Sequence, residues 1–102
     1  MLPIIVLPQA DSDIDTFFFY IAEDDVAVAD KFLERVEETQ KLIANFPKIA
    51  PMFITENPAL SGIRWFPVKN FPKHLLFYIE GESRISIVRM LHKAQDISNI
   101  LQ

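Results

Sequence analysis

The distribution of proline and glycine constrains the fold of this chain more than any other feature. All seven prolines and both glycines lie outside residues 9–46, so this long stretch contains no helix-breaking residue. Within it, apolar side chains recur at the i, i+3, i+4, i+7 spacing of a helix face. The two apolar stripes are Ile14, Phe17, Phe18 and Ile21, then Ala29, Phe32, Leu33, Val36 and Ile43. The stretch is therefore predicted to form two helices.

An acidic cluster, Glu23-Asp24-Asp25, separates the two stripes. Because Asp is a preferred N-cap residue, Asp24 or Asp25 is expected to begin the second helix, which Pro47 ends. A break this short predicts an antiparallel helix hairpin. The first turns of the first helix carry Asp11, Asp13 and Asp15, whose carboxylates favour the positive end of the helix dipole.

Outside this stretch, short runs rich in β-branched and aromatic residues predict four strands. These runs are Pro3–Leu7, Ile63–Val68, Leu75–Glu80 and Arg84–Leu91. The prolines of the first run predict an edge strand, and the run 75–79, apolar on both faces, predicts a middle strand covered by helices. The expected connections are a loop over 47–61, a link at Lys69–Lys73 and a hairpin turn at Glu80–Ser83, where glycine supplies a positive φ.

Lys93–Leu101 is expected to form a short terminal helix with Ile97, Ile100 and Leu101 facing inward. The order of elements predicts a single α+β domain over residues 1–102. It consists of an N-terminal strand, a two-helix antiparallel hairpin, a three-stranded antiparallel meander and a short C-terminal helix. A chain of this length buries roughly two-thirds of the surface that it exposes when unfolded, which is enough for one core.

Charge and composition exclude several classes of function. The formal net charge is −4, but residues 1–50 carry ten acidic and four basic side chains, hence −6, while residues 51–102 carry four and six, hence +2. An acidic chain is a poor non-specific ligand for nucleic acid. With no cysteine, two distant histidines and no acidic residues at metal-ligand spacing, neither a metal nor a cofactor is expected. Without a signal peptide or a membrane span, the chain is expected to be soluble and cytoplasmic.

Two arginines on neighbouring predicted strands are the first candidates for a binding site. Strand alternation places Arg64 with Phe66 and Val68, and places Arg89 with Ile85 and Ile87, opposite Met90. In one interpretation both guanidinium groups grip a phosphate or a carboxylate. In the other, each bonds a carboxylate or backbone carbonyls within the fold. The sequence leaves both interpretations open.

Residues near the arginines extend this candidate site. His92 precedes Asp96 by four positions, so on a helix the two would meet and the carboxylate would favour the imidazolium. The alternative is a histidine that ties the strand to the helix. Tyr78 either lends its hydroxyl to the site or is a core residue with a hydrogen-bonded tip. His74 is expected at the surface, and Trp65 is either a partner anchor or a core residue.

Six short sequence motifs occur in order along the chain: Tyr20–Asp24, Ala29–Leu33, Asn45–Pro47, Ile63–Val68, Leu76–Tyr78 and Ile87–His92. With the order of elements, they make about residues 4–101 resemble the RelE/ParE toxin superfamily. The closer similarity is to its ParE branch, the plasmid stabilisation proteins of type II toxin–antitoxin systems.

The resemblance implies an α+β toxin that a cognate antitoxin neutralises and that poisons a macromolecular target, DNA gyrase in ParE-like members. Arg64, Tyr78, Arg89 and His92 match motif positions of the family and, with Asp96, are the expected target-binding residues. The antitoxin is expected to lay an apolar helix and an extended segment on the hairpin and sheet. Its expected docking positions are Leu2, Ile5, Phe17 and Phe18.

Two alternatives remain beside a gyrase inhibitor that is not an enzyme. A RelE-like chain would cleave mRNA on the ribosome, with Arg64 and Arg89 on phosphate and His92 as the acid. A non-toxic interaction module of the same fold would have neither activity. The chain carries Ile79 where many ParE-like chains have a basic residue, and Lys93–Asp96 lacks the arginine common after the histidine. Its acidic charge disfavours RNA cleavage.

Overall fold

The computed structural model describes residues 1–102, and its elements follow the predicted order. They are β1 (Ile4–Val6), α1 (Pro8–Asp24), α2 (Val26–Asn45), the 3₁₀ turn η1 (Pro58–Leu60), β2 (Arg64–Val68), β3 (Phe71–Glu80), β4 (Ile85–His92) and α3 (Ile97–Ile100). The predicted α+β class, with its N-terminal strand, helix pair, meander and terminal helix, is confirmed. None of the helices combines the length and the apolar character needed to cross a membrane.

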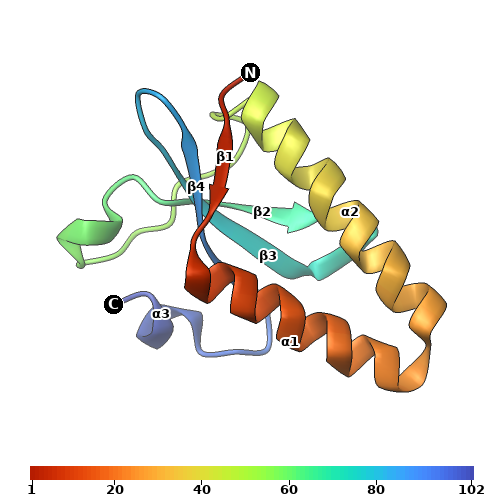
Figure 1. Ribbon diagram of the computed structural model, residues 1–102. Coiled ribbons are helices and arrows are strands. Elements are labelled where there is room, and N and C mark those ends of the chain that lie inside the picture. The colour runs from red at the N-terminus through yellow and green to blue at the C-terminus, as the bar shows by residue number, and fades with distance from the viewer.

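The four strands form one sheet in the order β1-β4-β3-β2. β1 runs parallel to β4 and pairs Ile4 with Ile85 and Val6 with Ile87. β2, β3 and β4 form the predicted antiparallel meander. β1 lies at the edge of the sheet, as its flanking prolines predict, and β3 and β4 occupy the middle (Figure 1).

Helices α1 and α2 form a hairpin on one side of the sheet, with α2 turning back at an angle from the end of α1 (Figure 1). Of the two candidate caps, Asp25 begins α2, and its carboxylate accepts a hydrogen bond from the Val28 amide at 3.2 Å. Such a cap contributes about 1 kcal/mol to stability. Pro8 occupies the first turn of α1, where its missing N–H costs no helical hydrogen bond.

The predicted apolar stripe of α2 is correct at four of its five positions. Ala29, Phe32, Val36 and Ile43 are buried, whereas Leu33 keeps 39% of its surface exposed. Leu33 therefore lies beside the buried face rather than on it.

The sheet separates two apolar cores. Under the helices, Ile14 and Phe32 pack with residues of all four strands, including the fully buried Tyr78. On the other face, a smaller core contains Ile63, Leu75, Phe77, Leu91 and Leu101. Trp65 and the terminal Ile97 and Ile100 pack half-buried against this second core, so the inward face predicted for the C-terminal segment is confirmed.

Two predicted boundaries differ from the structure. The link between β2 and β3 is only Lys69-Asn70, because Asn70 adopts a left-handed φ of 67° and reverses the chain at once. The C-terminal helix spans Ile97–Ile100 rather than Lys93–Leu101. The residues before it form a turn in which the Gln95 side chain accepts from the His92 amide at 2.7 Å, so this local bond replaces the expected first helical turn.

A β-bulge changes the face assignments predicted for β4. Phe77 pairs with Arg89 but its neighbour Tyr78 pairs with Ile87, so Val88 is an extra residue in the ladder. Beyond an extra residue the alternation of side chains shifts by one position. The predicted grouping was therefore wrong for Met90, which shares the helix-side core with Ile85 and Ile87.

Candidate functional site

Arg64 has an internal partner in the structure. One of its terminal guanidinium nitrogens donates to the Ala50 carbonyl at 2.6 Å, across a separation of 14 residues. This bond ties β2 to the segment that follows α2. Arg64 pairs with Tyr78 in the ladder, so these two expected site residues do lie side by side.

Tyr78 is completely buried, and its hydroxyl donates to the Pro47 carbonyl at 2.7 Å. Burial raises the pKa of the phenol, although the nearby Arg64 charge lowers it in part. The side chain is thus the core tyrosine with a hydrogen-bonded tip that the second interpretation describes. Together with Arg64 it anchors the residues after α2 onto the sheet.

Arg89 is held by a carboxylate from α1. Its Nε donates to Asp13 Oδ2 at 2.7 Å, and a terminal nitrogen donates to Asp13 Oδ1 at 3.1 Å. The Met90 amide also donates to Asp13 Oδ2, at 3.0 Å. The two side chains are only 24% and 10% exposed, so the pair fastens the helix hairpin to the middle of the sheet. Both arginines therefore have the internal partners of the second interpretation, and their contact with a target stays a prediction.

The expected contact between His92 and Asp96 is not formed. His92 Nδ1 accepts from the Ala94 amide at 3.0 Å, which places the proton of the neutral ring on Nε2. Asp96 instead accepts from the Asn99 side chain at 2.6 Å. The predicted contact needed a helical turn over residues 92–96, and the structure has a tight non-helical turn there.

His74 was predicted at the surface, and this prediction was wrong. It pairs with His92 across β3 and β4, and its ring lies in an aromatic cluster with centroids 4.9 Å from Phe17, 5.1 Å from Phe32 and 5.0 Å from His92. Its Nδ1 is buried without a hydrogen-bond partner. Burial, and then the neighbouring His92, lower the pKa of His74 to about 4. Counting the ladder outward from the Gly81 turn places His74 opposite Leu91, and only the extra residue at the bulge brings His92 opposite His74.

The two histidines open onto a surface hollow of about 330 Å³. Thr16, Phe17 and Tyr20 of α1 line its other side. Two imidazoles therefore line the hollow: that of His74 resists protonation, and that of His92 has no hydrogen-bond partner at Nε2. A half-buried polar pair of this kind suits ligand binding. No group of three or more His, Cys, Asp or Glu side chains is placed to hold a metal ion.

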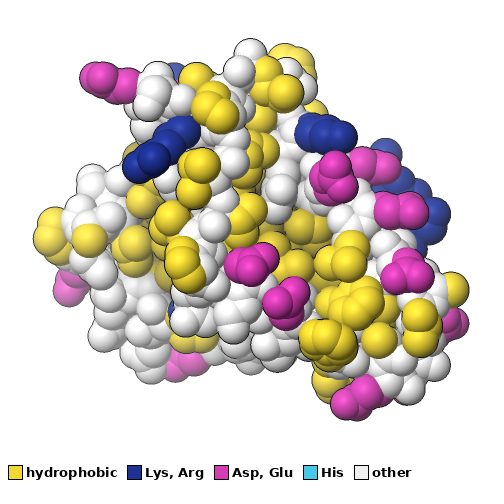
Figure 2. Space-filling view, viewed as in Figure 1, with side chains coloured by type: hydrophobic (Ala, Val, Ile, Leu, Met, Phe, Trp, Pro, Cys, Tyr) yellow, Lys and Arg dark blue, Asp and Glu magenta, His cyan; other side chains and the backbone are white.

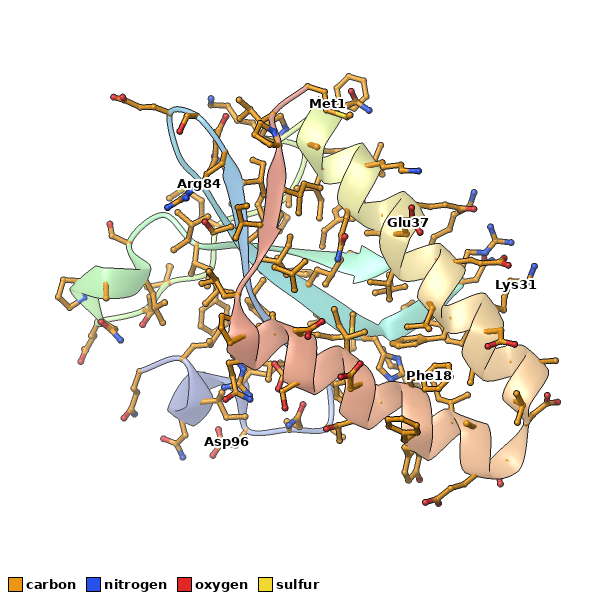
Figure 3. The ribbon with its side chains drawn as sticks, viewed as in Figure 1. Met1, Phe18, Lys31, Glu37, Arg84 and Asp96 are labelled. Carbon is orange, nitrogen blue, oxygen red and sulfur yellow. The ribbon has the colours of Figure 1, made fainter.

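The four expected antitoxin-docking residues lie in different environments. Leu2 is partly buried against the helix-side core, and Ile5 of the edge strand is 43% exposed. Phe17 points toward His74, whereas Phe18 is half-buried and contacts Phe19 at a ring distance of 5.3 Å. Figure 3 labels Phe18 in the region where α1 and α2 approach each other. Their role in docking stays a prediction.

A four-stranded mixed sheet with a helix hairpin on one face, and two strand arginines bonded within the fold, defines a small α+β domain. The family model described as "ParE toxin of type II toxin-antitoxin system, parDE" matches residues 4–97. The chain therefore belongs to the ParE toxin family of type II toxin–antitoxin systems.

A solved structure with the same fold is described as "Chromosomal ParDE TA system from P. aeruginosa". The TM-score is 0.70 at 17% sequence identity, and the alignment covers 90% of this chain and 96% of the other. At this identity the similarity shows the fold alone. No curated protein matches the chain.

Proposed function

We propose that this ParE-family chain acts by binding a protein target, DNA gyrase, and that a cognate antitoxin blocks this binding. The observation that supports binding rather than catalysis is the position of the two strand arginines. Arg64 donates to the Ala50 carbonyl and Arg89 to Asp13, so each guanidinium already uses part of its donors within the fold rather than on a phosphate. The acidic net charge of −4 supports the same conclusion, because RNA repels such a surface.

The proposed antitoxin surface lies on the exposed side of the hairpin and the edge strand. Ile5 of β1 is 43% exposed, whereas Phe18 of α1 and Leu2, which precedes β1, are half-buried. An apolar helix laid on such a surface, with an extended segment along the open edge of β1, combines two common modes of peptide recognition.

Expression of the chain alone tests toxicity directly. We expect growth arrest that is relieved when the adjacent reading frame is co-expressed, and inhibition of gyrase supercoiling by the purified protein. A variant with Ile5→Glu should remain toxic but escape the antitoxin, whereas Glu82→Lys in the β3–β4 turn is a control that should change neither property. Strong expression without arrest would support the non-toxic interaction module instead.

The histidine hollow favours a second candidate, the ribosome-dependent mRNA endonuclease. His92 has a free Nε2 beside His74, and Lys73 lines an adjoining hollow of about 250 Å³ with both histidines. An imidazole acid and a nearby cation are suitable groups for phosphodiester cleavage. If this candidate holds, translating ribosomes incubated with the protein should show A-site cleavage that His92→Gln abolishes. Intact mRNA in that assay removes the candidate.

A further inference from the structure

The exposed face of the helix hairpin combines apolar and acidic side chains. Phe19 is 65% exposed, Val26 62% and Leu33 39%, and the half-buried Phe18 packs against Phe19. Figure 2 shows hydrophobic side chains gathered over the part of the hairpin where α1 meets α2, with acidic side chains beside them. We call this surface, made of Phe18, Phe19, Val26 and Leu33, the hairpin patch.

Each helix repeats the same spacing along this face. In α1 the positions i, i+4, i+7 and i+11 are Asp11, Asp15, Phe18 and Ala22. In α2 the same spacing gives Val26, Asp30, Leu33 and Glu37. Residues at this spacing share one side of a helix. On each helix the carboxylates and the apolar residues therefore lie along the same side.

The carboxylates beside the hairpin patch lack internal ion pairs. Asp11, Asp15 and Asp30 take part in none of the ion pairs of the structure, and all three are exposed. Residues 1–30 contain seven acidic residues and no Lys or Arg, so α1 has no cation of its own to neutralise them. The potential at this face is therefore negative and available to a partner.

The negative charge beside the hairpin patch indicates which kind of partner can bind there. A second copy in a symmetric dimer would set these carboxylates against themselves, which is a like-charge contact. An anionic membrane or a nucleic acid would be repelled in the same way. A protein segment with an apolar stripe between Lys or Arg residues satisfies both the apolar patch and its acidic border.

We propose that the hairpin patch binds a basic amphipathic helix, whose apolar side chains contact Phe18, Val26 and Leu33 and whose cationic side chains meet Asp15 and Asp30. The inference rests on the proposed function, because this helix is assigned to the cognate antitoxin. It deepens that function by specifying the charge of the partner: this toxin selects a positively charged antitoxin segment.

Two synthetic peptides test the inference without the antitoxin. Both are about 20 residues long, enough for a helix, and carry the same leucine stripe, with Lys in one and Glu in the other at the flanking positions. We expect fluorescence anisotropy to show binding of the Lys peptide that weakens as salt rises from about 50 to 200 mM. The Glu peptide should bind at least about tenfold more weakly, since opposite charges attract and like charges repel across the interface.

Charge reversal in the protein supplies the matched comparison. The double variant Asp15→Lys with Asp30→Lys should weaken the Lys peptide by about tenfold and strengthen the Glu peptide. The control Glu56→Lys with Glu82→Lys changes the net charge equally at exposed residues outside the hairpin, and should leave both affinities unchanged. Leu33→Ser should weaken both peptides, and circular dichroism should show that every variant is folded.

Equal affinities of the two peptides, no binding of either, or an equal effect of the control double variant would each overturn the inference. The proposed function fails by a different result, namely no growth arrest and no relief by the adjacent reading frame. If the antitoxin relieves the arrest as well in the Asp15→Lys, Asp30→Lys variant as in the parent, the function stands and the charge inference falls.

Discussion

Helix α1 meets the sheet at two places that handle polar groups in opposite ways. At the first, Asp13 accepts hydrogen bonds from Arg89 and from the Met90 amide, so every charge has a partner. At the second, Phe17 packs on His74, whose buried Nδ1 has none. The contact at Asp13 therefore stabilises the fold. The contact at His74 leaves a polar group unsatisfied beside a hollow, which is a common feature of ligand-binding sites.

The largest effect is expected from breaking the first contact. Asp13→Ala leaves the half-buried Arg89 guanidinium and the Met90 amide without their acceptor, which should lower the free energy of unfolding by about 2–3 kcal/mol. Urea unfolding followed by circular dichroism measures the loss. Asp11→Ala, two positions earlier at an exposed and unpaired carboxylate, should change stability by less than about 0.5 kcal/mol. Similar losses in the two variants would contradict a stabilising role for the contact of Asp13 with Arg89.

The second contact should be sensitive to acid. The pKa of His74 is lowered to about 4 by burial and by His92, whereas the unfolded chain has its ordinary value near 6.5. Between these values the unfolded state binds a proton that the folded state excludes, so stability is complete above pH 6.5 and falls as the pH drops toward 4. We expect a loss of about 1–2 kcal/mol between pH 7 and pH 5, measured by urea unfolding at each pH.

Replacing His74 separates the free-energy cost of burying its unpartnered nitrogen from the contribution of its ring to packing. His74→Phe keeps a ring among Phe17, Phe32 and Phe71 but removes the unpartnered nitrogen, so stability at pH 7 should change by less than about 1 kcal/mol. The same variant should lose most of the extra acid sensitivity. An unaltered pH profile in this variant would assign the effect to another group.

The smallest effect should come from removing the exposed hydrogen bond that Gln9 makes with Asp13. Gln9 donates to Asp13 Oδ1 at 3.1 Å from the solvent side of α1. Gln9→Ala should therefore cost less than about 0.5 kcal/mol in thermal or urea unfolding, because water replaces the lost donor. A loss comparable to that of Asp13→Ala would show that the stabilisation by Asp13 depends on its hydrogen bond with Gln9 rather than on Arg89.

Much of the fold could be predicted from local rules. The helix hairpin follows from a breaker-free stretch with two apolar stripes, and its second helix begins at Asp25 because a carboxylate there caps the Val28 amide. The meander follows from β-branched runs and turn residues. These signals act within a few positions of one another, so one sequence suffices to find them.

The candidate site could be predicted less well, because its contacts are long-range. Arg89 finds its carboxylate 76 positions away, and no local pattern identifies Asp13 as the partner. The bulge at Val88 shifts the side-chain alternation that the face assignments assumed. The predicted contact of His92 with Asp96 assumed helical spacing in a segment that is a turn. His74 was predicted at the surface because it begins a strand, and the bulge hides its cross-strand neighbour His92 from the sequence.

The pairing of β1 with β4 has a consequence for synthesis of the chain. Ile4 leaves the ribosome well before its ladder partner Ile85, which lies far along the chain. Until then the apolar segment PIIVL has no strand to add to, and the sheet cannot be completed on the nascent polypeptide. The four-stranded sheet can therefore form only after the residues of β4 have been synthesised.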